Sequence, residues 1–510
     1  MKRILALLLC AVLILLCGCG SNGDDPYVPT GNALDIADTA TPDEVEVTKE
    51  QIFIPYYPDR SLNPYQCTDY VNKSILSLLY QGLFALDQNH ESWPILCQSY
   101  QVSWDMKTYT FTLAEATFSD GTAVTAEDVE ASLKAAKESD VYKGRFGYVD
   151  KISATEDGKV EIRMEIPYEG LPLLLDVPIV KATEVEEPTP LGTGPYVFMS
   201  GDRPALQRRS GWWCTGSVPV TADSLRLLSA GTPSELRDAF EFSNLSMVTT
   251  DPGSDTYADF HSDYELWESE NGIFLYLGCN GKSNVLSNSD LRREVLQAVD
   301  RESIVAEFYH GFATAVTLPA SPHSPYYNQA LANQYTYNPM RLTQAVEEYR
   351  DTATLEAILL VNGDDSIRLR VANRIAQDLN RCGMKVKVNA LPTKDYTRAL
   401  KKGEYDLYLG QTRLSPTMDL SAFFEPKGTL SFGGMEDPVL YALCMDSLAN
   451  KGNYYNLHQK VLEKGMLCPI LLRSYAIYTR RGSFRGLAPS RDNLFFYHLG
   501  RTMEDALVTE

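Results

Sequence analysis

Residues 108–137 read TYTFTLAEATFSDGTAVTAEDVEASLKAAK, a stretch whose pattern changes from strand to turn to helix. Tyr109, Phe111 and Leu113 alternate with threonines. An apolar side chain at every second position predicts a strand that buries one of its faces. This segment is therefore expected in a sheet with one covered side.

The second half of the stretch carries the signals of a turn and of a helix start. The Asp-Gly pair at 120–121 predicts a tight turn, because glycine adopts backbone angles that other residues avoid. Thr125 can cap a helix that has Glu127 and Asp128 in its first turn, where negative charge is favourable. The same order of residues begins at Asp300 and predicts a second capped helix.

Outside this stretch, helices and strands alternate irregularly, which indicates a mixed α/β fold rather than a repeat. A strand pattern runs from about 44–57, and apolar residues recur at helical spacing over 71–83. Later segments predict a strand at 355–361, a helix at 367–383 that ends in glycine, and a strand at 384–391.

The chain begins with two basic residues and a run of 13 apolar residues at 4–16. Spanning a bilayer takes about 20 apolar residues, so this run predicts a secretory signal peptide at 1–18. The sequence LCGC at 16–19 resembles the lipobox of bacterial lipoproteins. That resemblance implies that Cys19 is lipid-modified and becomes the N-terminus. An uncleaved anchor and secretion in soluble form are the alternatives.

Residues 19–45 are expected to form a lipidated, flexible tether. Between Gly20 and Glu50 the chain has eight acidic residues and one basic residue, Lys49. Such a segment buries too little apolar surface to offset the entropy of ordering it. A flexible linker of about 30 residues lets a globular body reach away from the membrane.

Composition excludes several partners for this body. The whole chain has a net charge of −21, and removing Lys2 and Arg3 with the signal leaves 44 basic against 67 acidic residues, or −23. A charge this negative argues against binding to nucleic acid or to anionic membrane surfaces. About 460 residues beyond the tether exceed one hydrophobic core, so two or three domains are expected.

The sequence holds no pattern that indicates catalysis, a metal or another cofactor. Seven cysteines beyond the tether are scattered singly, and the six histidines show no metal-ligand spacing. There is no G-x-S-x-G motif and no complete phosphate-binding loop. We therefore expect a protein that is not an enzyme, with most of these cysteines acting as small buried apolar residues. An odd number of exported cysteines leaves at least one thiol free or bonded between molecules.

Six segments carry a resemblance to a known family. They are LNPY (62–65), LLYQGLFALD (78–87), SYQVSWDMKTYTFTLAEATFSDGTAVTAEDVEASL (99–133), LGTGPYVF (191–198), LRREVLQAVDRESIVAEFYHGFATAVTLPASP (291–322) and YDLYLG (405–410). In this order they resemble the extracellular solute-binding proteins of family 5, the peptide- and nickel-binding subunits of ABC importers. The resemblance implies an α/β fold with two lobes, of the periplasmic-binding-protein type II kind, with three domains and a two-strand hinge.

The resemblance also implies limits for the domains. The hinge strands are expected near GIFLYLGCN (272–280) and SYAIYTRRG (474–482). The domains are then 46–64 with 184–272 and 481–510 for domain I, 65–183 for domain II, and 273–480 for domain III.

A cleft between the lobes is where such a protein holds its ligand. In peptide-binding members of the family, an acidic residue in a loop late in domain III pairs with the amine of the ligand. The corresponding loop here is GQTRLSPTMDLSAFF (410–424), with Gln411 or its neighbour in place of the Trp of the family motif. Alignment from the preceding strand puts the acid near Leu414 or Ser415, and alignment from the AFF end puts it at Asp419.

Ligand contacts are therefore expected from Asp419, Arg413, Gln411, Ser415, Tyr408 and Asn280. A buried ammonium without a carboxylate partner is costly, so either Asp419 serves it or the ligand presents no free amine there. Arg413 can bind a ligand carboxylate, but it can also be a solvated loop charge or pair with Asp419. Asp419 can instead cap the helix of LSAFF, and Tyr408 can be part of a strand core.

These features imply a lipid-anchored, monomeric receptor on the outer face of a bacterial cell membrane. It would capture oligopeptides and deliver them to ABC permease subunits. Nickel chelates, haem and oligosaccharides are other ligands that the resemblance leaves open. A stand-alone peptide sensor shares the same fold and cleft, so it remains the alternative to transport.

Overall fold

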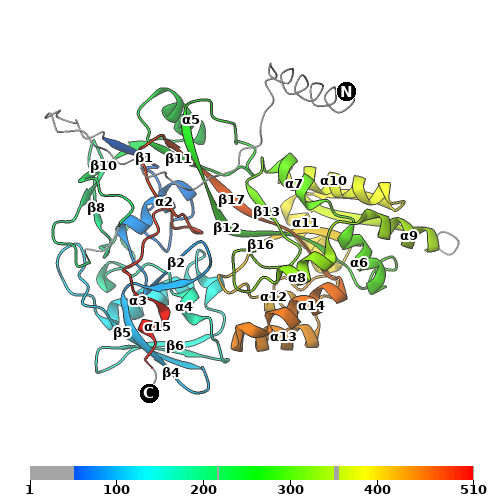
Figure 1. Ribbon diagram of the computed structural model, residues 1–510, viewed down its shortest axis with the longest axis horizontal. Helices are drawn as coiled ribbons and strands as arrows, with labels where there is room; N and C mark the ends of the chain where they lie inside the picture. Colours follow the sequence, from blue (N-terminus) through cyan, green and yellow to red (C-terminus); the bar gives the residue numbers. More distant parts are fainter. Residues whose placement is uncertain (1–50, 215–217, 350–354, 509–510) are drawn as a thin grey trace, which may run out of the picture. The chain divides into compact units, whose positions relative to one another are not determined.

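The computed structural model describes residues 51–508 except 215–217 and 350–354 (Figure 1). The predicted signal peptide, Cys19 and the whole of the predicted tether lie outside these residues. The described chain is mixed α/β, and its strands form four sheets. Within this part, no helix is both long and apolar enough to cross a membrane.

Two four-stranded sheets form the core of one lobe, which we call the first lobe. The order β1-β10-β9-β8 joins β1 (Ile52–Tyr56), β10 (Ser224–Ser229), β9 (Ala205–Arg208) and β8 (Tyr196–Met199), with β1 parallel to β10. The antiparallel order β4-β5-β7-β6 joins β4 (Cys97–Val102), β5 (Thr108–Leu113), β7 (Val160–Met164) and β6 (Val149–Ala154). This lobe also contains a short antiparallel pair, β2 (Phe84–Leu86) and β3 (Ser92–Pro94). Its helices are α2 (Tyr70–Leu79), α3 (Ala126–Glu138), α4 (Leu171–Leu174), α5 (Pro233–Phe242) and α15 (Met503–Ala506).

The stretch at 108–137 folds as its pattern predicts. Tyr109 and Phe111 are buried on β5, and Gly121 takes a positive φ of 85° in the turn that follows. The Thr125 side chain accepts a hydrogen bond from the backbone N–H of Asp128, and the Asp128 carboxylate in turn accepts one from the backbone N–H of Thr125. This reciprocal capping begins α3, which packs against β6.

A seven-stranded sheet extends into the second lobe. Its order is β11-β17-β12-β16-β14-β15, and β13 also pairs with β17. The strands are β11 (Met247–Thr250), β12 (Tyr264–Cys279), β13 (Ala313–Ala315), β14 (Glu356–Asn362), β15 (Lys385–Leu391), β16 (Leu407–Arg413) and β17 (Leu467–Arg480). The helices of this lobe are α6 (Ser289–Gln297), α7 (Arg301–Phe308), α8 (Gln329–Ala332), α9 (Pro339–Tyr349), α10 (Ser366–Arg381), α11 (Thr393–Lys402), α12 (Ser421–Phe424), α13 (Pro438–Ala449) and α14 (Tyr454–Lys464).

Strands β12 and β17 join the two lobes and confirm the predicted fold class. They pair antiparallel from Tyr264 opposite Arg480 to Gly278 opposite Leu467, and both run from one lobe into the other (Figure 1). Each is longer than the segment that the sequence predicts. The register shifts between Glu270 and Phe274, where Gly272 has a φ of 74°. The residue limits of the three domains stay a prediction.

The buried side chains form separate clusters in the two lobes. One cluster of buried side chains packs between the sheets of the first lobe, and two others cover the opposite faces of β14 and β16 in the second. All seven cysteines in the described part are free thiols, and six of them are buried, which confirms their predicted role as small apolar residues.

His458 on α14 is a polar exception inside the second lobe. It is 0% exposed, and neither ring nitrogen has a hydrogen-bond partner among the described residues. Burial lowers the pKa of His458 to about 3, so the folded protein holds this side chain neutral.

We expect His458→Met to lose less stability than the unchanged protein between pH 7 and pH 5. The pKa of His458 is lower in the folded than in the unfolded state, so below about pH 6.5 the unfolded chain takes the proton first. That difference removes at most about 2 kcal/mol of stability at pH 5. Thermal unfolding at the two pH values measures it, with the exposed His261→Met as a matched control. Equal losses in all three proteins would contradict the expectation.

Candidate ligand-binding site between the lobes

The loop at 414–419 is one part of the second lobe that lies against the first. The hydroxyl groups of Tyr168 and Thr417 are 2.8 Å apart across the interface. Thr417 is held in place from its own lobe, because its hydroxyl is 3.0 Å from that of Ser415 and its carbonyl accepts from the Tyr454 hydroxyl. Two of the predicted site residues, Ser415 and Asp419, are in this loop.

A second set of contacts joins β16 to the C-terminal segment of the first lobe. Arg413 Nη2 donates to Asp492 Oδ2 at 2.7 Å, and Arg413 Nε donates to the carbonyl of Asn271 at 3.0 Å. The Arg413 side chain is still 31% exposed. The structure thus pairs Arg413 with Asp492 and not with Asp419.

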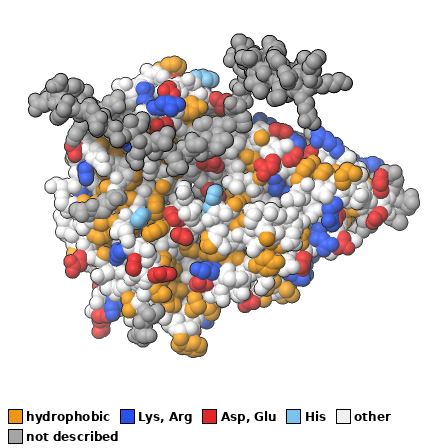
Figure 2. Space-filling view, in the orientation of Figure 1, with side chains coloured by type: hydrophobic (Ala, Val, Ile, Leu, Met, Phe, Trp, Pro, Cys, Tyr) orange, Lys and Arg blue, Asp and Glu red, His pale blue; other side chains and the backbone are white. Residues whose placement is uncertain are grey.

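Four basic and two acidic side chains gather here, and we call them the interlobe charge cluster: Lys73, Arg145, Asp176, Arg413, Arg491 and Asp492. Lys73 Nζ lies 4.0 Å from Asp492 Oδ1, and Arg145 forms an ion pair with Asp176. Burial opposes the ionisation of Asp492, but Arg413 and Lys73 hold the pKa of its carboxyl well below its usual range. On the face in Figure 2, acidic and basic side chains are instead interspersed.

Arg491 is the cluster member without an ionic partner among the described residues. It is 6% exposed, and its Nη2 donates to the carbonyl of Leu414 at 3.0 Å. Its Nε and Nη1 have no hydrogen-bond partner in the described chain. Burial, and then the charges of Arg413 and Arg145, lower the pKa of Arg491 to about 9.

The backbone around Arg491 is arranged to admit its guanidinium. Arg491 itself has a φ of 51°, a left-handed conformation that is uncommon for a residue with a side chain. A Cβ atom on Gly272 would lie 2.7 Å from Arg491 Nη1, so only glycine at the β12 irregularity leaves this space. The rings of Tyr70 and Tyr475 stack at 5.4 Å beside the cluster. With Lys73, Arg491 and Asp492, they line a cavity of about 20 Å³.

Asp419, in the 414–419 loop, carries a charge opposite to that of Arg491. Its carboxylate accepts from the Ser421 backbone N–H at 2.8 Å and from the Ser421 hydroxyl at 2.9 Å, at the start of α12. No basic side chain of the described residues forms an ion pair with it. Burial raises the pKa of Asp419, and its charge in turn contributes to the raised pKa values of Tyr148 and Tyr168 in the first lobe.

The remaining predicted contacts are engaged within the protein. Gln411 accepts from Arg473 Nη1 at 3.2 Å. Tyr408 is fully buried in the core of the second lobe, with its hydroxyl 3.6 Å from the sulfur of Met435. Asn280 is also buried, and its amide donates to the Tyr405 carbonyl at 2.8 Å. Ligand contact by these three residues stays a prediction.

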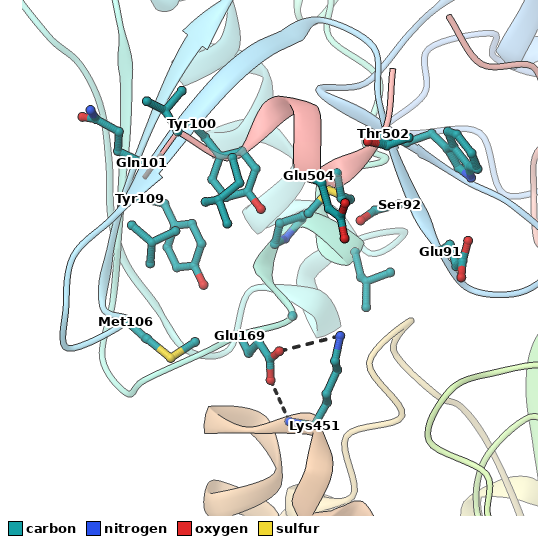
Figure 3. Close-up of a pocket in the computed structure, with 18 of the residues that line it drawn as sticks. Glu91, Ser92, Tyr100, Gln101, Met106, Tyr109, Glu169, Lys451, Thr502 and Glu504 are labelled. Atoms are coloured by element: carbon teal, nitrogen blue, oxygen red, sulfur yellow. Dashed lines mark hydrogen bonds and ion pairs between the residues drawn. The ribbon is translucent and has the colours of Figure 1, made fainter. Parts of the chain in front are cut away.

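A larger cavity, of about 1480 Å³ (Figure 3), includes Gly170 in its lining, and Gly170 lies against Thr417 of the 414–419 loop. The first lobe supplies most of its wall, from β3, β4, β5, α4 and the segment around α15, and the second lobe adds Pro325, Tyr326 and Lys451. Figure 3 shows Lys451 directed at Glu169, with backbone N to Oε2 at 2.7 Å and Nζ to Oε1 at 3.8 Å. None of the six predicted contact residues lines this cavity.

One wall residue connects the cavity to the hinge. His90 Nε2 lies 3.4 Å from Glu270 Oε1, and the Ser321 hydroxyl of the second lobe donates to Glu270 Oε2 at 2.8 Å. Burial alone would raise the pKa of Glu270, but His90, Ser321 and the charge of Arg491 together lower it. One oxygen of this carboxylate is therefore hydrogen-bonded, while the other faces His90 without a hydrogen bond.

Sequence reasoning missed Arg491, Asp492, Lys73 and Arg145. They come from separate segments of the first lobe and belong to no motif. The Arg-Asp pair at 491–492 stands in a stretch without regular structure, so nothing in the sequence distinguishes it from a solvated turn.

Comparison with known proteins decides the family. The model of "Bacterial extracellular solute-binding proteins, family 5 Middle" matches residues 92–431. The chain belongs to this family. A similar family 5 protein is the glutathione-binding protein GsiB of Shigella flexneri, which is 25% identical over 351 residues, or 65% of this chain and 67% of that protein.

Solved structures show the same fold at lower identity. A nickel ABC transporter protein from Bacillus halodurans superposes with a TM-score of 0.73 at 20% identity, over 88% of this chain and 99% of that one. The oligopeptide-binding protein AppA of Bacillus subtilis, in complex with a nonapeptide, gives 0.59 at 17% identity, over 87% and 97%. These likenesses show that the chain has the fold of these solved structures.

We expect Gly170→Ala to oppose contact between the lobes. Gly170 has a φ of −84°, which alanine adopts freely, but its Cβ would lie 2.7 Å from Thr417 Cγ2. Thr417 cannot turn away without losing its hydrogen bonds to Tyr168 and Ser415. Overpacking of this kind costs about 1–3 kcal/mol.

The double variant Gly170→Ala with Thr417→Ser is the control, because serine keeps the hydroxyl and lacks the methyl group. Small-angle X-ray scattering should give a larger radius of gyration for Gly170→Ala and the original value for the double variant. The same radius in all three proteins would show that this contact does not limit closure.

Proposed function

We propose that the protein is a lipid-anchored substrate-binding protein that captures oligopeptides between its lobes and delivers them to an ABC permease. The observation that carries the peptide assignment is Asp419, a carboxylate at the lobe interface with no basic partner among the described residues. A peptide amine supplies the missing positive charge. Binding then favours the closed arrangement, which presents a surface made from both lobes to the permease.

The size and lining of the large cavity support the same ligand class. At about 1480 Å³ it exceeds the range of about 300–1,000 Å³ that is usual for small-molecule sites. Its wall mixes aromatic rings with hydroxyl, amide and charged groups, including Tyr100, Tyr109 and Glu504 (Figure 3). Such a wall accepts varied side chains through bridging water.

The names of two similar proteins point the same way. GsiB is named for glutathione and AppA was solved with a nonapeptide, so both take ligands with amide bonds. A non-peptide solute with several acid groups is the second candidate, favoured by the excess of basic groups in the interlobe charge cluster. In either case the protein binds its solute as a monomer and does not convert it.

Native mass spectrometry of the protein from Glu44 onward tests peptide capture. We expect a ladder of co-purified peptide masses, and we expect Asp419→Ala to weaken or remove it because the amine loses its partner. Asp140→Ala is the matched control, since Asp140 is 85% exposed and pairs only with a neighbouring lysine. A single discrete non-peptide mass would replace the peptide assignment by a specialised solute.

The proposed membrane anchor has its own test. We expect Cys19→Ser to move the protein from the membrane fraction to the medium or periplasm, because serine accepts no thioether-linked lipid and one short apolar segment holds poorly. Immunoblotting of the two fractions measures this. Cys17→Ser keeps the lipid acceptor and is the control. Membrane retention of the Cys19 variant would favour an uncleaved anchor.

A further inference from the structure

Arg491 presents buried donors that no described group of the protein accepts. Two of its nitrogens, Nε and Nη1, lack hydrogen-bond partners, and the residue is only 6% exposed. A buried donor left unpaired destabilises the folded protein, and more so when the group is charged. A side chain of this kind at a lobe interface needs a partner from outside the protein.

Two of the three acidic groups near Arg491 already have basic partners. Asp492 accepts from Arg413 and lies near Lys73, while Asp176 pairs with Arg145. The third, Glu270, acts on Arg491 only through its charge: its Oε2 accepts from Ser321, and its Oε1 lies 3.4 Å from His90 Nε2 without a hydrogen bond. The interlobe charge cluster therefore keeps an excess of positive charge inside a strongly acidic protein.

The backbone around Arg491 takes unfavourable conformations that make space for its guanidinium. Its own φ of 51° is unfavourable for a residue with a side chain, and Gly272 must lack a Cβ for the guanidinium to fit. Unusual backbone angles of this sort persist where function requires them. The left-handed backbone of Arg491 and the glycine at position 272 thus both serve to place the Arg491 guanidinium beside the hinge.

We propose that the interlobe charge cluster is an anion subsite in which Arg491 binds a carboxylate of the captured solute. This inference rests on the proposed function, because it assigns the acidic end of the solute that the lobes enclose. The carboxylate accepts a charge-assisted hydrogen bond from Nε or Nη1. Lys73, Arg145 and Arg413 add positive potential, and Tyr70 and Tyr475 line the cavity beside it.

The subsite complements Asp419 across the same loop. Leu414 accepts from Arg491 at one end of the loop, and Asp419 lies at the other end. The two uncompensated charges have opposite signs, as do the two ends of a peptide. In the sequence, Arg413 is the candidate partner of a ligand carboxylate, but its guanidinium pairs with Asp492. The carboxylate is therefore assigned to Arg491.

Thermal unfolding with three random tripeptide mixtures tests the proposal. The first mixture has free C-terminal carboxylates and no Asp or Glu, the second is the same set as C-terminal amides, and the third is the amide set with one Glu in each peptide. We expect the first or third mixture to raise the melting temperature and the second to raise it least. The first reports a main-chain carboxylate, and the third reports a side-chain carboxylate.

Variants then assign the effect to the guanidinium. We expect Arg491→Gln to weaken binding of the acidic mixture about ten- to a hundredfold and to erase its advantage over the amides. Its ligand-free melting temperature should not fall sharply, because an uncompensated buried charge is removed. Arg398→Gln, at a side chain that is 61% exposed on α11, is the matched control.

Each outcome separates the two proposals. If the amides bind as well as the acids, the anion subsite is overturned while peptide capture stands. A second outcome is that no peptide mixture binds, whereas the tricarboxylate tricarballylate binds and Arg491→Gln abolishes its binding. The anion subsite then stands, and the proposal of peptide capture is overturned. If neither tricarballylate nor any mixture changes the melting temperature, the subsite is overturned. The comparison of acids with amides needs no variant, so poor folding of Arg491→Gln would not prevent a decision.

Discussion

The backbone hydrogen bonds between β12 and β17 are the constraint on which the rest of the structure depends. Both strands belong to both lobes, so their register fixes which residues of one lobe can meet residues of the other. The register shifts between Glu270 and Phe274, and the chain bends where Gly272 permits it. That irregularity, and not a loop, makes room for the guanidinium at the interface.

Charge is distributed differently inside and outside this protein. The surface carries interspersed acids and bases with a large net negative charge, while basic groups outnumber acids in the interlobe charge cluster. A negative exterior repels anionic solutes at long range, although salt screens that repulsion beyond about 8–10 Å. Selection by such a cluster therefore acts at contact distance, once a solute has entered between the lobes.

The sequence predicted the parts of the fold that depend on local chemistry. The capped start of α3 at Thr125, the capped start of α7 at Asp300, and the end of α10 before Gly383 all follow from neighbouring residues. The resemblance to family 5 added the two-lobed arrangement and the crossing strands. The helix ends and the two-lobed arrangement were both predicted correctly, because short stretches of the sequence carry the pattern for each.

The site was only partly predictable. The 414–419 loop could be located because it follows a recognisable strand, yet the partner of Arg413 could not, since Asp492 lies 79 residues away. Tyr408 carried the residue type of a cleft contact, but alternation along β16 directs it into the core. Arg491 gave no signal, because its role arises only when the five distant segments of the interlobe charge cluster meet.

The first lobe is built from both ends of the described chain. Strand β1 pairs with β10, β11 pairs with β17, and the amide of Gln81 donates to the Tyr497 hydroxyl, 416 positions later. Contacts between such distant positions form late, because a long loop must close before they contribute. A polypeptide emerging from the ribosome thus cannot finish this lobe until the residues around Tyr497 are made. For a member of an extracellular family, late completion of a lobe leaves time for export before the chain folds.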